Sequence, residues 1–156
     1  MDKKTPEESR TILSQVMMPR HASHYGNVHG GEIMKLVDEV AYVAASRHAR
    51  RNIVTAAIDS LDFRSRVYPG DVVTLRAEVT YAGRTSMEIE VKVETERIKT
   101  GETMLVAEAH VVMVALDEKG NPTSVPGLEP RTPAEWARYE EAQRRRKVRL
   151  PQRYSP

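Results

Sequence analysis

The sequence GNVHGGEIMKLVD, residues 26–38, joins a polar loop that contains three glycines directly to an apolar helical pattern. Glycine has no side chain, so Gly30 and Gly31 allow a ligand to approach the backbone closely. The first N–H groups of a helix have no partner within the helix, and they carry the positive end of its dipole. The segment therefore predicts a place where backbone donors can stabilise a developing oxyanion.

The residues that follow indicate a long central helix over 33–47. At 100° per residue, its apolar side chains form one broad arc that is wider than a surface helix needs. Asp38 falls at the edge of this arc and Glu39 falls on the polar side, so we expect Asp38 to be half buried and Glu39 exposed. A half-buried carboxylate beside free backbone donors is a candidate general base or nucleophile. The alternative is an ordinary aspartate at the rim of a core helix.

Beyond this helix, the sequence predicts an antiparallel sheet of about five strands. In residues 73–79 and 87–93 apolar side chains alternate with polar ones, which gives each strand a dry face and a wet face. Further strands are expected at 12–18, at 53–63 and in the run 109–116. Turn residues separate these runs at hairpin-like spacing, at 70–71, 82–83, 100–101 and 120–122, and this favours a meander. The predicted fold class is α+β, with the sheet wrapped around the helix.

Read as G-N-x-H-G-G-x-I-M-x-x-x-D, residues 26–38 resemble the signature of the hotdog-fold acyl-CoA thioesterases, in the subgroup of cytosolic and brain acyl-CoA hydrolases. The resemblance continues through residues 59–63, 69–73, 83–86 and 109–116. It implies one hotdog domain over residues 10–125, and the absence of an internal repeat makes this a single-module version of a family that also contains tandem chains. The implied function is hydrolysis of fatty acyl-CoA to free fatty acid and CoA, in fatty acid metabolism, with no cofactor beyond the CoA of the substrate. A non-catalytic acyl-CoA-binding sensor of the same fold is the alternative.

The resemblance also implies a pair of functional residues, which correspond here to Asn27 in the glycine loop and Asp38 on the central helix. We expect the N–H of Gly31, with help from Gly30, to polarise the thioester carbonyl, and His29 to line the site. Asp38 either attacks the carbonyl carbon to give a mixed anhydride or activates water as a general base. The sequence leaves both routes open.

For the CoA end of the substrate, the resemblance points to the turn formed by Gly83, Arg84, Thr85 and Ser86. Arg64 and Arg66 form a candidate cationic patch for the phosphates of CoA. The alternative is an exposed hairpin with ordinary surface arginines.

Helix geometry favours a site that is shared between two chains. If the helix begins near Gly30, Asp38 lies about 12 Å along it, and Asn27 precedes its start. Reacting groups must approach within about 3 to 3.5 Å, so these two side chains of one chain cannot readily meet at one thioester carbon. A two-fold dimer with antiparallel helices brings Asn27 of one chain beside Asp38 of the other. The resemblance implies the same shared site, usually in a homohexamer built as a trimer of dimers.

Residues 131–150 are predicted to form an added basic helix outside the family core. Thr132-Pro133-Ala134-Glu135 is a capping box with proline at the first helical position. Residues 131–156 contain eight Lys or Arg against three Asp or Glu, so the basic charge of the chain is concentrated there. Solvated terminal charge, a surface for nucleic acid or membrane, and attraction of CoA phosphates are the three interpretations. Few aromatic residues accompany the arginines, so nucleic acid is not the expected partner.

Composition excludes several classes of site. The 156-residue chain has no cysteine, which removes disulfides, thiolate nucleophiles and Cys-ligated zinc. Its five histidines show no metal-ligand spacing beside suitable carboxylates, so we predict no metal. No apolar run approaches the roughly 18 residues that span a bilayer, and the N-terminal residues lack the apolar core of a signal peptide. These features predict a cytoplasmic protein.

Overall fold

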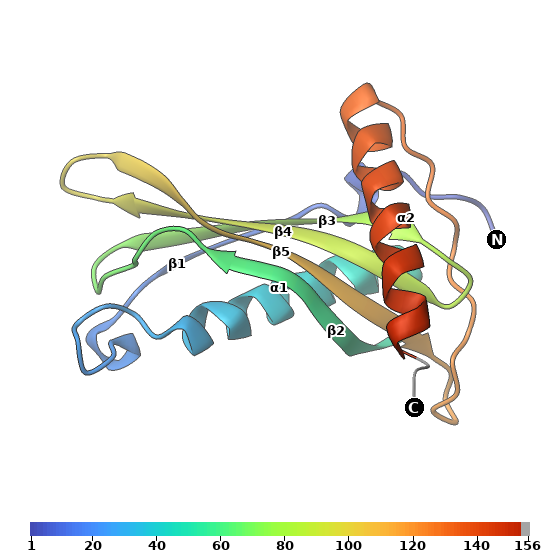
Figure 1. Cartoon of the computed structure of the whole chain (residues 1–156), viewed down its shortest axis with the longest axis horizontal. Coiled ribbons are helices and arrows are strands. Elements are labelled where there is room, and N and C mark those ends of the chain that lie inside the picture. The colour runs from blue at the N-terminus through green and yellow to red at the C-terminus, as the bar shows by residue number, and fades with distance from the viewer. Residues whose placement is uncertain (154–156) are drawn as a thin grey trace.

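The computed structural model describes residues 1–153 and shows one antiparallel sheet wrapped around a long helix (Figure 1). A second helix crosses the strands near one end of the sheet. In chain order, the elements are η1 (Pro6–Ser9), β1 (Thr11–Val16), η2 (Pro19–His21), α1 (Gly30–Ala49), β2 (Asn52–Phe63), β3 (Val72–Ala82), β4 (Ser86–Arg97), β5 (Glu102–Leu116) and α2 (Pro133–Arg153). The predicted architecture, a five-stranded sheet around a long helix with an added C-terminal helix, is confirmed.

The strand order in the sheet is β1-β3-β4-β5-β2, and every neighbouring pair is antiparallel. The predicted meander is present only in β3, β4 and β5. The strands β1 and β2 flank it at opposite edges, because the chain passes through α1 between them. One edge of the sheet is therefore the 12-residue strand β2, which pairs with β5 on one side only.

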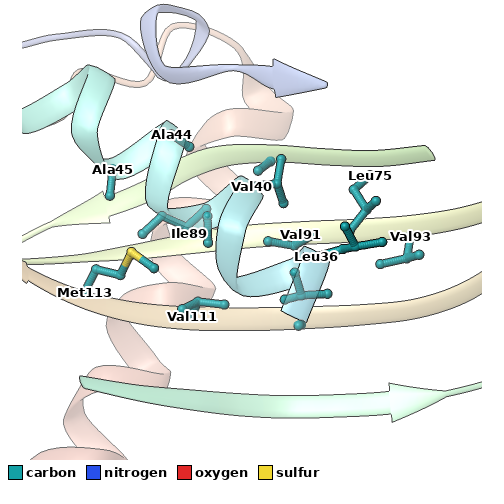
Figure 2. Close-up of a cluster of buried hydrophobic side chains, with 14 of the residues drawn as sticks. Leu36, Val40, Ala44, Ala45, Leu75, Ile89, Val91, Val93, Val111 and Met113 are labelled. Carbon is teal, nitrogen blue, oxygen red and sulfur yellow. The ribbon is translucent and has the colours of Figure 1, made fainter. Parts of the chain in front are cut away.

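One face of the sheet and one face of α1 together form the apolar core (Figure 2). Leu36, Val40 and Ala44 of α1 face Ile89 and Val91 of β4, and all five side chains are buried. Burying one such Val, Leu or Ile side chain stabilises a fold by about 1.5 to 3 kcal/mol. The helix is thus fixed across the middle strands, and this packing decides which of its polar residues reach the surface.

Asp38 and Glu39 occupy the positions that the helical pattern predicts. The side chain of Asp38 is half buried at the margin of the packed face, whereas Glu39 is exposed. Adjacent residues lie 100° apart around an α-helix, so Asp38 lies at the edge of the apolar arc while Glu39 lies outside it.

One end of the opposite face of the sheet is covered by α2, which corrects one expectation from the sequence. Alternation places Glu88 on a wet face of β4, yet its side chain is only 1% exposed. Arg145 of α2 donates a hydrogen bond from Nε to Glu88 Oε1 at 2.6 Å. Burial raises the pKa of the Glu88 carboxyl, and the hydrogen bond and charge of Arg145 oppose that rise. Alternation of apolar and polar residues cannot show that a distant helix covers the polar side.

Ion pairs between α2 and the sheet also decide between the interpretations of the basic tail. Arg138 pairs with Glu78 at 2.8 Å, and Arg149 pairs with Asp59 at 2.6 Å. Solvated terminal charge is therefore the wrong interpretation for Arg138, Arg145 and Arg149, each of which binds a carboxylate of the sheet. Within the described residues, no helix is long and apolar enough to cross a membrane.

The capping box predicted at the start of α2 is present. Glu135 N–H donates to Thr132 Oγ1 at 3.1 Å, and Thr132 N–H donates to Glu135 Oε1 at 3.3 Å. Glu135 also binds Arg10, which precedes β1, at 3.1 Å. The beginning of α2 is thereby anchored to the other edge of the sheet.

A buried histidine connects the end of α1 to the segment before α2. His48 is fully buried, and its Nε2 donates to the carbonyl oxygen of Pro126 at 2.6 Å. Burial lowers the pKa of His48, although the hydrogen bond to Pro126 acts in the opposite direction. The folded protein therefore favours the neutral imidazole.

We expect this histidine to make stability depend on pH. A depressed folded-state pKa contributes stability that is present above the unfolded value of about 6.5 and is lost as pH falls through the folded value. Replacing His48→Gln retains a donor for Pro126 but cannot titrate, so the free energy of unfolding should fall less steeply below pH 6.5, by up to about 1.4 kcal/mol per pH unit. Urea unfolding between pH 7.5 and 5 measures this slope. The exposed His24→Gln variant is the control, and equal slopes for wild type and His48→Gln would contradict the assignment.

Candidate active site

Asp38 lies at the margin of α1 that faces the edge strand β2. Thr55 of β2 donates a hydrogen bond from Oγ1 to Asp38 Oδ1 at 2.6 Å. This bond fixes the orientation of the carboxylate, whose second oxygen also has acceptor capacity. Thr55 is absent from the residues predicted from sequence, because nothing local indicates which β2 residue will face Asp38.

Exposed apolar side chains flank this carboxylate. Met34 and Tyr42 lie four residues before and after Asp38, on the same side of α1, and they are 40% and 48% exposed. Phe63, at the end of β2, is also exposed, and its ring lies against the backbone of Gly30. The site thus combines an oriented carboxylate with apolar surface along the β2 edge. Such surface is typical of a place where an apolar ligand or a second protein chain binds.

The loop before α1 is held by its own backbone. Ser23 N–H donates to the Asn27 carbonyl at 2.6 Å, and Gly26 N–H donates to the Ser23 carbonyl at 3.0 Å. Gly26 has a φ of +91°, a conformation that favours glycine. Val28 N–H then bonds to the Val67 carbonyl at 2.7 Å, which attaches the loop to the segment after β2. The loop is therefore a defined structure rather than a free linker.

Two polar side chains meet inside this loop. Ser23 Oγ donates to Asn27 Oδ1 at 3.4 Å and accepts the N–H of Tyr25 at 3.2 Å. The Asn27 amide nitrogen donates to the carbonyl of Val28 at 3.3 Å. Both ends of the Asn27 amide are thus engaged within the loop.

The helix begins at Gly30, with His29 as its N-cap residue. The His29 side chain is exposed and makes no capping hydrogen bond. Gly30 and Gly31 occupy the first turn, where N–H groups have no acceptor within the helix. A side chain added at Gly30 would meet the ring of Phe63 at 3.4 Å, whereas nothing lies within 4 Å at Gly31. The open approach to the backbone is therefore at Gly31.

Within one chain, the glycine loop and Asp38 are not brought together. Because α1 starts at Gly30, Asp38 lies about 12 Å along the helix, and Asn27 precedes its first turn. The structure thus has the geometry that led to the expectation of a shared site.

The residues expected to contact CoA lie at two ends of the sheet. Arg64 N–H bonds to the carbonyl of Val106, whereas the carbonyl of Thr85 accepts the N–H of Ala115. Val106 and Ala115 both belong to β5 and are nine residues apart in the sequence. At about 3.3 Å per residue, they lie roughly 30 Å apart. Arg64 and the exposed Arg66 therefore cannot join the turn at 83–86 around one phosphate group of the same chain.

The turn itself is tight and packed. Gly83 N–H donates to the Ser86 carbonyl at 2.8 Å, and the Arg84 carbonyl accepts the N–H of Val125 at 2.9 Å. Its backbone is thus attached to the segment that precedes α2, while the Arg84 side chain is exposed. Gly83 faces the guanidinium of Arg146 on α2, so the turn lies beside a second cation. Among the described residues, no group of three or more His, Asp or Glu is placed to hold a metal ion.

Comparison with known proteins identifies the class to which this fold belongs. Residues 25–102 match the family model of the thioesterase superfamily. The crystal structure of an apo-hexameric acyl-CoA thioesterase superposes with a TM-score of 0.94 and is 39% identical, over 100% of both chains. The chain belongs to the thioesterase superfamily and has its hotdog fold.

Two other relatives carry acyl-CoA hydrolase names. The cytosolic acyl coenzyme A thioester hydrolase of Rattus norvegicus is 37% identical over 143 residues, which are 90% of this chain and 38% of that protein. The acyl-CoA hydrolase of Staphylococcus aureus, solved with butyryl coenzyme A and coenzyme A, superposes with a TM-score of 0.90 and 33% identity, over 97% of this chain and 92% of that one. The same hydrolase is also known as single alanine variants of an aspartate, an asparagine and a threonine.

The open space at Gly31 generates a prediction that separates stability from activity. In Gly31→Ala the added methyl group meets no atom of its own chain, so the free energy of unfolding should be unchanged or should rise by up to about 1 kcal/mol. The same methyl group would occupy the open space through which a thioester approaches the Gly31 N–H, so thioester hydrolysis should fall by about 100-fold. Thermal unfolding and steady-state kinetics measure the two effects. Full activity in the folded variant would remove the Gly31 N–H from the site.

Proposed function

We propose that this protein is an acyl-CoA hydrolase that releases free fatty acid and CoA at a site shared between two copies of the chain. The observation that carries the proposal is the position of Asp38, which is oriented by Thr55 and flanked by Met34 and Tyr42 at the β2 edge. A carboxylate with apolar neighbours suits a substrate that joins a polar thioester to an apolar acyl chain. The acyl-CoA hydrolase relatives support this substrate class.

The free edge of β2 supports the shared site. Two copies of an edge strand can pair in antiparallel fashion about a two-fold axis, which also makes the two α1 helices antiparallel. The glycine loop of one copy then lies beside Asp38 of the other. A hexamer built as a trimer of such dimers is the assembly we propose, and the hexameric relative supports it.

The same two-fold pairing accounts for the divided CoA residues. It brings the end of β2 that carries Arg64 and Arg66 in one copy toward the turn at 83–86 of the other. Residues that lie roughly 30 Å apart within one chain then line one binding site between chains. Arg84 and the Arg64–Arg66 pair are the cations that we assign to the phosphates of CoA.

In the proposed reaction, Asp38 acts as a general base. It takes a proton from a water molecule, whose oxygen attacks the thioester carbonyl carbon. The Gly31 N–H and the positive end of α1 stabilise the resulting oxyanion, and His29 borders this position. The C–S bond then breaks, and the proton passes from Asp38 to the departing thiolate of CoA. Thr55 holds one oxygen of the carboxylate in place and leaves the other oxygen free to accept the proton.

We place this reaction in the cytoplasm. The support is the rat relative, which is named as a cytosolic enzyme and is 37% identical to this chain.

Replacing Asp38→Asn tests the function directly. Asparagine keeps the size of the side chain and an acceptor for Thr55 but cannot take a proton, so turnover should fall by about 100- to 10,000-fold. Release of free thiol from fatty acyl-CoA measures turnover. Glu39→Gln is the matched control, since it makes the same chemical change one residue further along α1, at an exposed position, and should retain activity. Tight acyl-CoA binding without turnover by the wild type would instead support the sensor function.

Mixing inactive chains tests the shared site. One variant, Ser23→Ala with Asn27→Ala, lacks the two polar side chains of the loop that bond to each other, and the other variant is Asp38→Ala. Random exchange makes about half of the dimers mixed, each with one intact site of two, so activity should return to about a quarter of the wild-type value. Mass spectrometry of chains labelled to different masses verifies that the two variants exchange subunits. If mixed dimers form and remain inactive, both parts of the site belong to one chain.

A further inference from the structure

Ser23 lies in the loop before α1, outside the sequence motif that begins at Gly26. Its distance along the chain from Asp38 can be compared with the spacing of the residues that were substituted in a relative. In the Staphylococcus aureus hydrolase, the substituted asparagine precedes the substituted aspartate by 15 positions, and the substituted threonine follows the aspartate by 17. In this chain Thr55 follows Asp38 by the same 17 positions and is bonded to it at 2.6 Å. The spacing therefore transfers without a gap from α1 into β2.

The substituted asparagine of the relative lies 15 positions before its aspartate, and the residue 15 positions before Asp38 in this chain is Ser23. Asn27 is 11 positions before Asp38 and does not fit it. By this spacing, Ser23 corresponds to the substituted asparagine of the relative, and the loop asparagine of this chain, Asn27, lies four residues later.

The contacts within the loop give the two residues different roles. Asn27 is engaged at both ends of its amide, by Ser23 Oγ and by the Val28 carbonyl. Ser23 Oγ donates its proton to Asn27 and accepts one hydrogen bond from Tyr25 N–H, while a hydroxyl oxygen has two lone pairs. One acceptor position on Ser23 therefore remains for a further donor.

We propose that Ser23 Oγ, rather than the Asn27 amide, is the loop group that contacts the attacking water, and that Asn27 is a positioning residue that orients the Ser23 hydroxyl. This inference rests on the proposed function and refines the roles within that site. The water donates one proton to Ser23 Oγ as a hydrogen bond and the other to Asp38 of the second chain, which removes it. Its oxygen is thereby held toward the carbonyl carbon. An asparagine side chain supplies the same kind of acceptor through its carbonyl oxygen, so the proposed contact is compatible with either residue type at this position.

Four variants test the division of roles through kcat and KM for fatty acyl-CoA. We expect Ser23→Ala to lower kcat by about 10- to 100-fold with little change in KM, because it removes a contact to water and none to the substrate. Asn27→Ala should lower kcat by about 10-fold, because the Ser23 hydroxyl loses its acceptor and rotates freely. Ser23→Asn should stay within about threefold of the wild type. The double variant Ser23→Asn with Asn27→Ala should equal Ser23→Asn, since the new amide no longer needs Asn27.

The control is Ser14→Ala on β1. It removes a serine hydroxyl that bonds to Thr74 Oγ1 of β3 at 2.8 Å, and it should not alter kcat. Thermal unfolding identifies any variant that loses stability. If Ser23→Ala alone disturbs the loop, the rescue of Asn27→Ala by Ser23→Asn still decides between the roles, because a merely structural bond would not be restored by it.

The outcomes distinguish this inference from the function on which it rests. An active wild type with full kcat in Ser23→Ala, or a 100-fold loss in Asn27→Ala that Ser23→Asn does not rescue, overturns the role of Ser23 and leaves the hydrolase function standing. No thiol release from the wild type overturns the proposed function and the role of Ser23 together.

Discussion

The packing of α1 across the apolar face of the sheet is the constraint on which the rest of this structure depends. Leu36, Val40 and Ala44 are buried against Ile89 and Val91, so the helix cannot rotate without exposing apolar surface to water. That fixed rotation places Asp38 at the margin facing β2, where Thr55 reaches it. It also fixes the start of α1, and with it the direction in which the backbone donors of the first turn point.

The second face of the sheet is organised by charge rather than by apolar contact. Three arginines of α2 bind Glu78, Glu88 and Asp59, and the nearly complete burial of Glu88 makes its pairing with Arg145 obligatory for a charged carboxylate. Part of the basic composition of the C-terminal segment is thus an internal complement to acidic strands. A chain with the same net charge but neutral strands would present those arginines to solvent, where nucleic acid or an anionic surface could bind them.

The length of a rigid helix is the physical reason for proposing that two copies of the chain form one site. The groups that the chemistry requires are set about 12 Å apart along α1, and no side chain of ordinary length closes that distance within one chain. In the proposed dimer, a two-fold axis along the β2 edge brings the loop of one copy beside Asp38 of the other, and it also brings together the two halves of the CoA site. In that proposed dimer, the exposed apolar residues near the edge would form both an interface and a substrate surface.

The sequence by itself determined those features that depend on local periodicity. The 3.6-residue repeat predicted a half-buried Asp38 beside an exposed Glu39, alternation predicted the strands, and the capping box predicted the start of α2. The resemblance of residues 26–38 added the family and the candidate site. Only the tertiary structure decided which strands lie at the edges, that Thr55 meets Asp38, that Glu88 is buried, and that Ser23 and Asn27 share a hydrogen bond. These contacts depend on strand register, on loop conformation and on which face a distant helix covers, and residues far apart in the chain establish them together, so no local pattern records them.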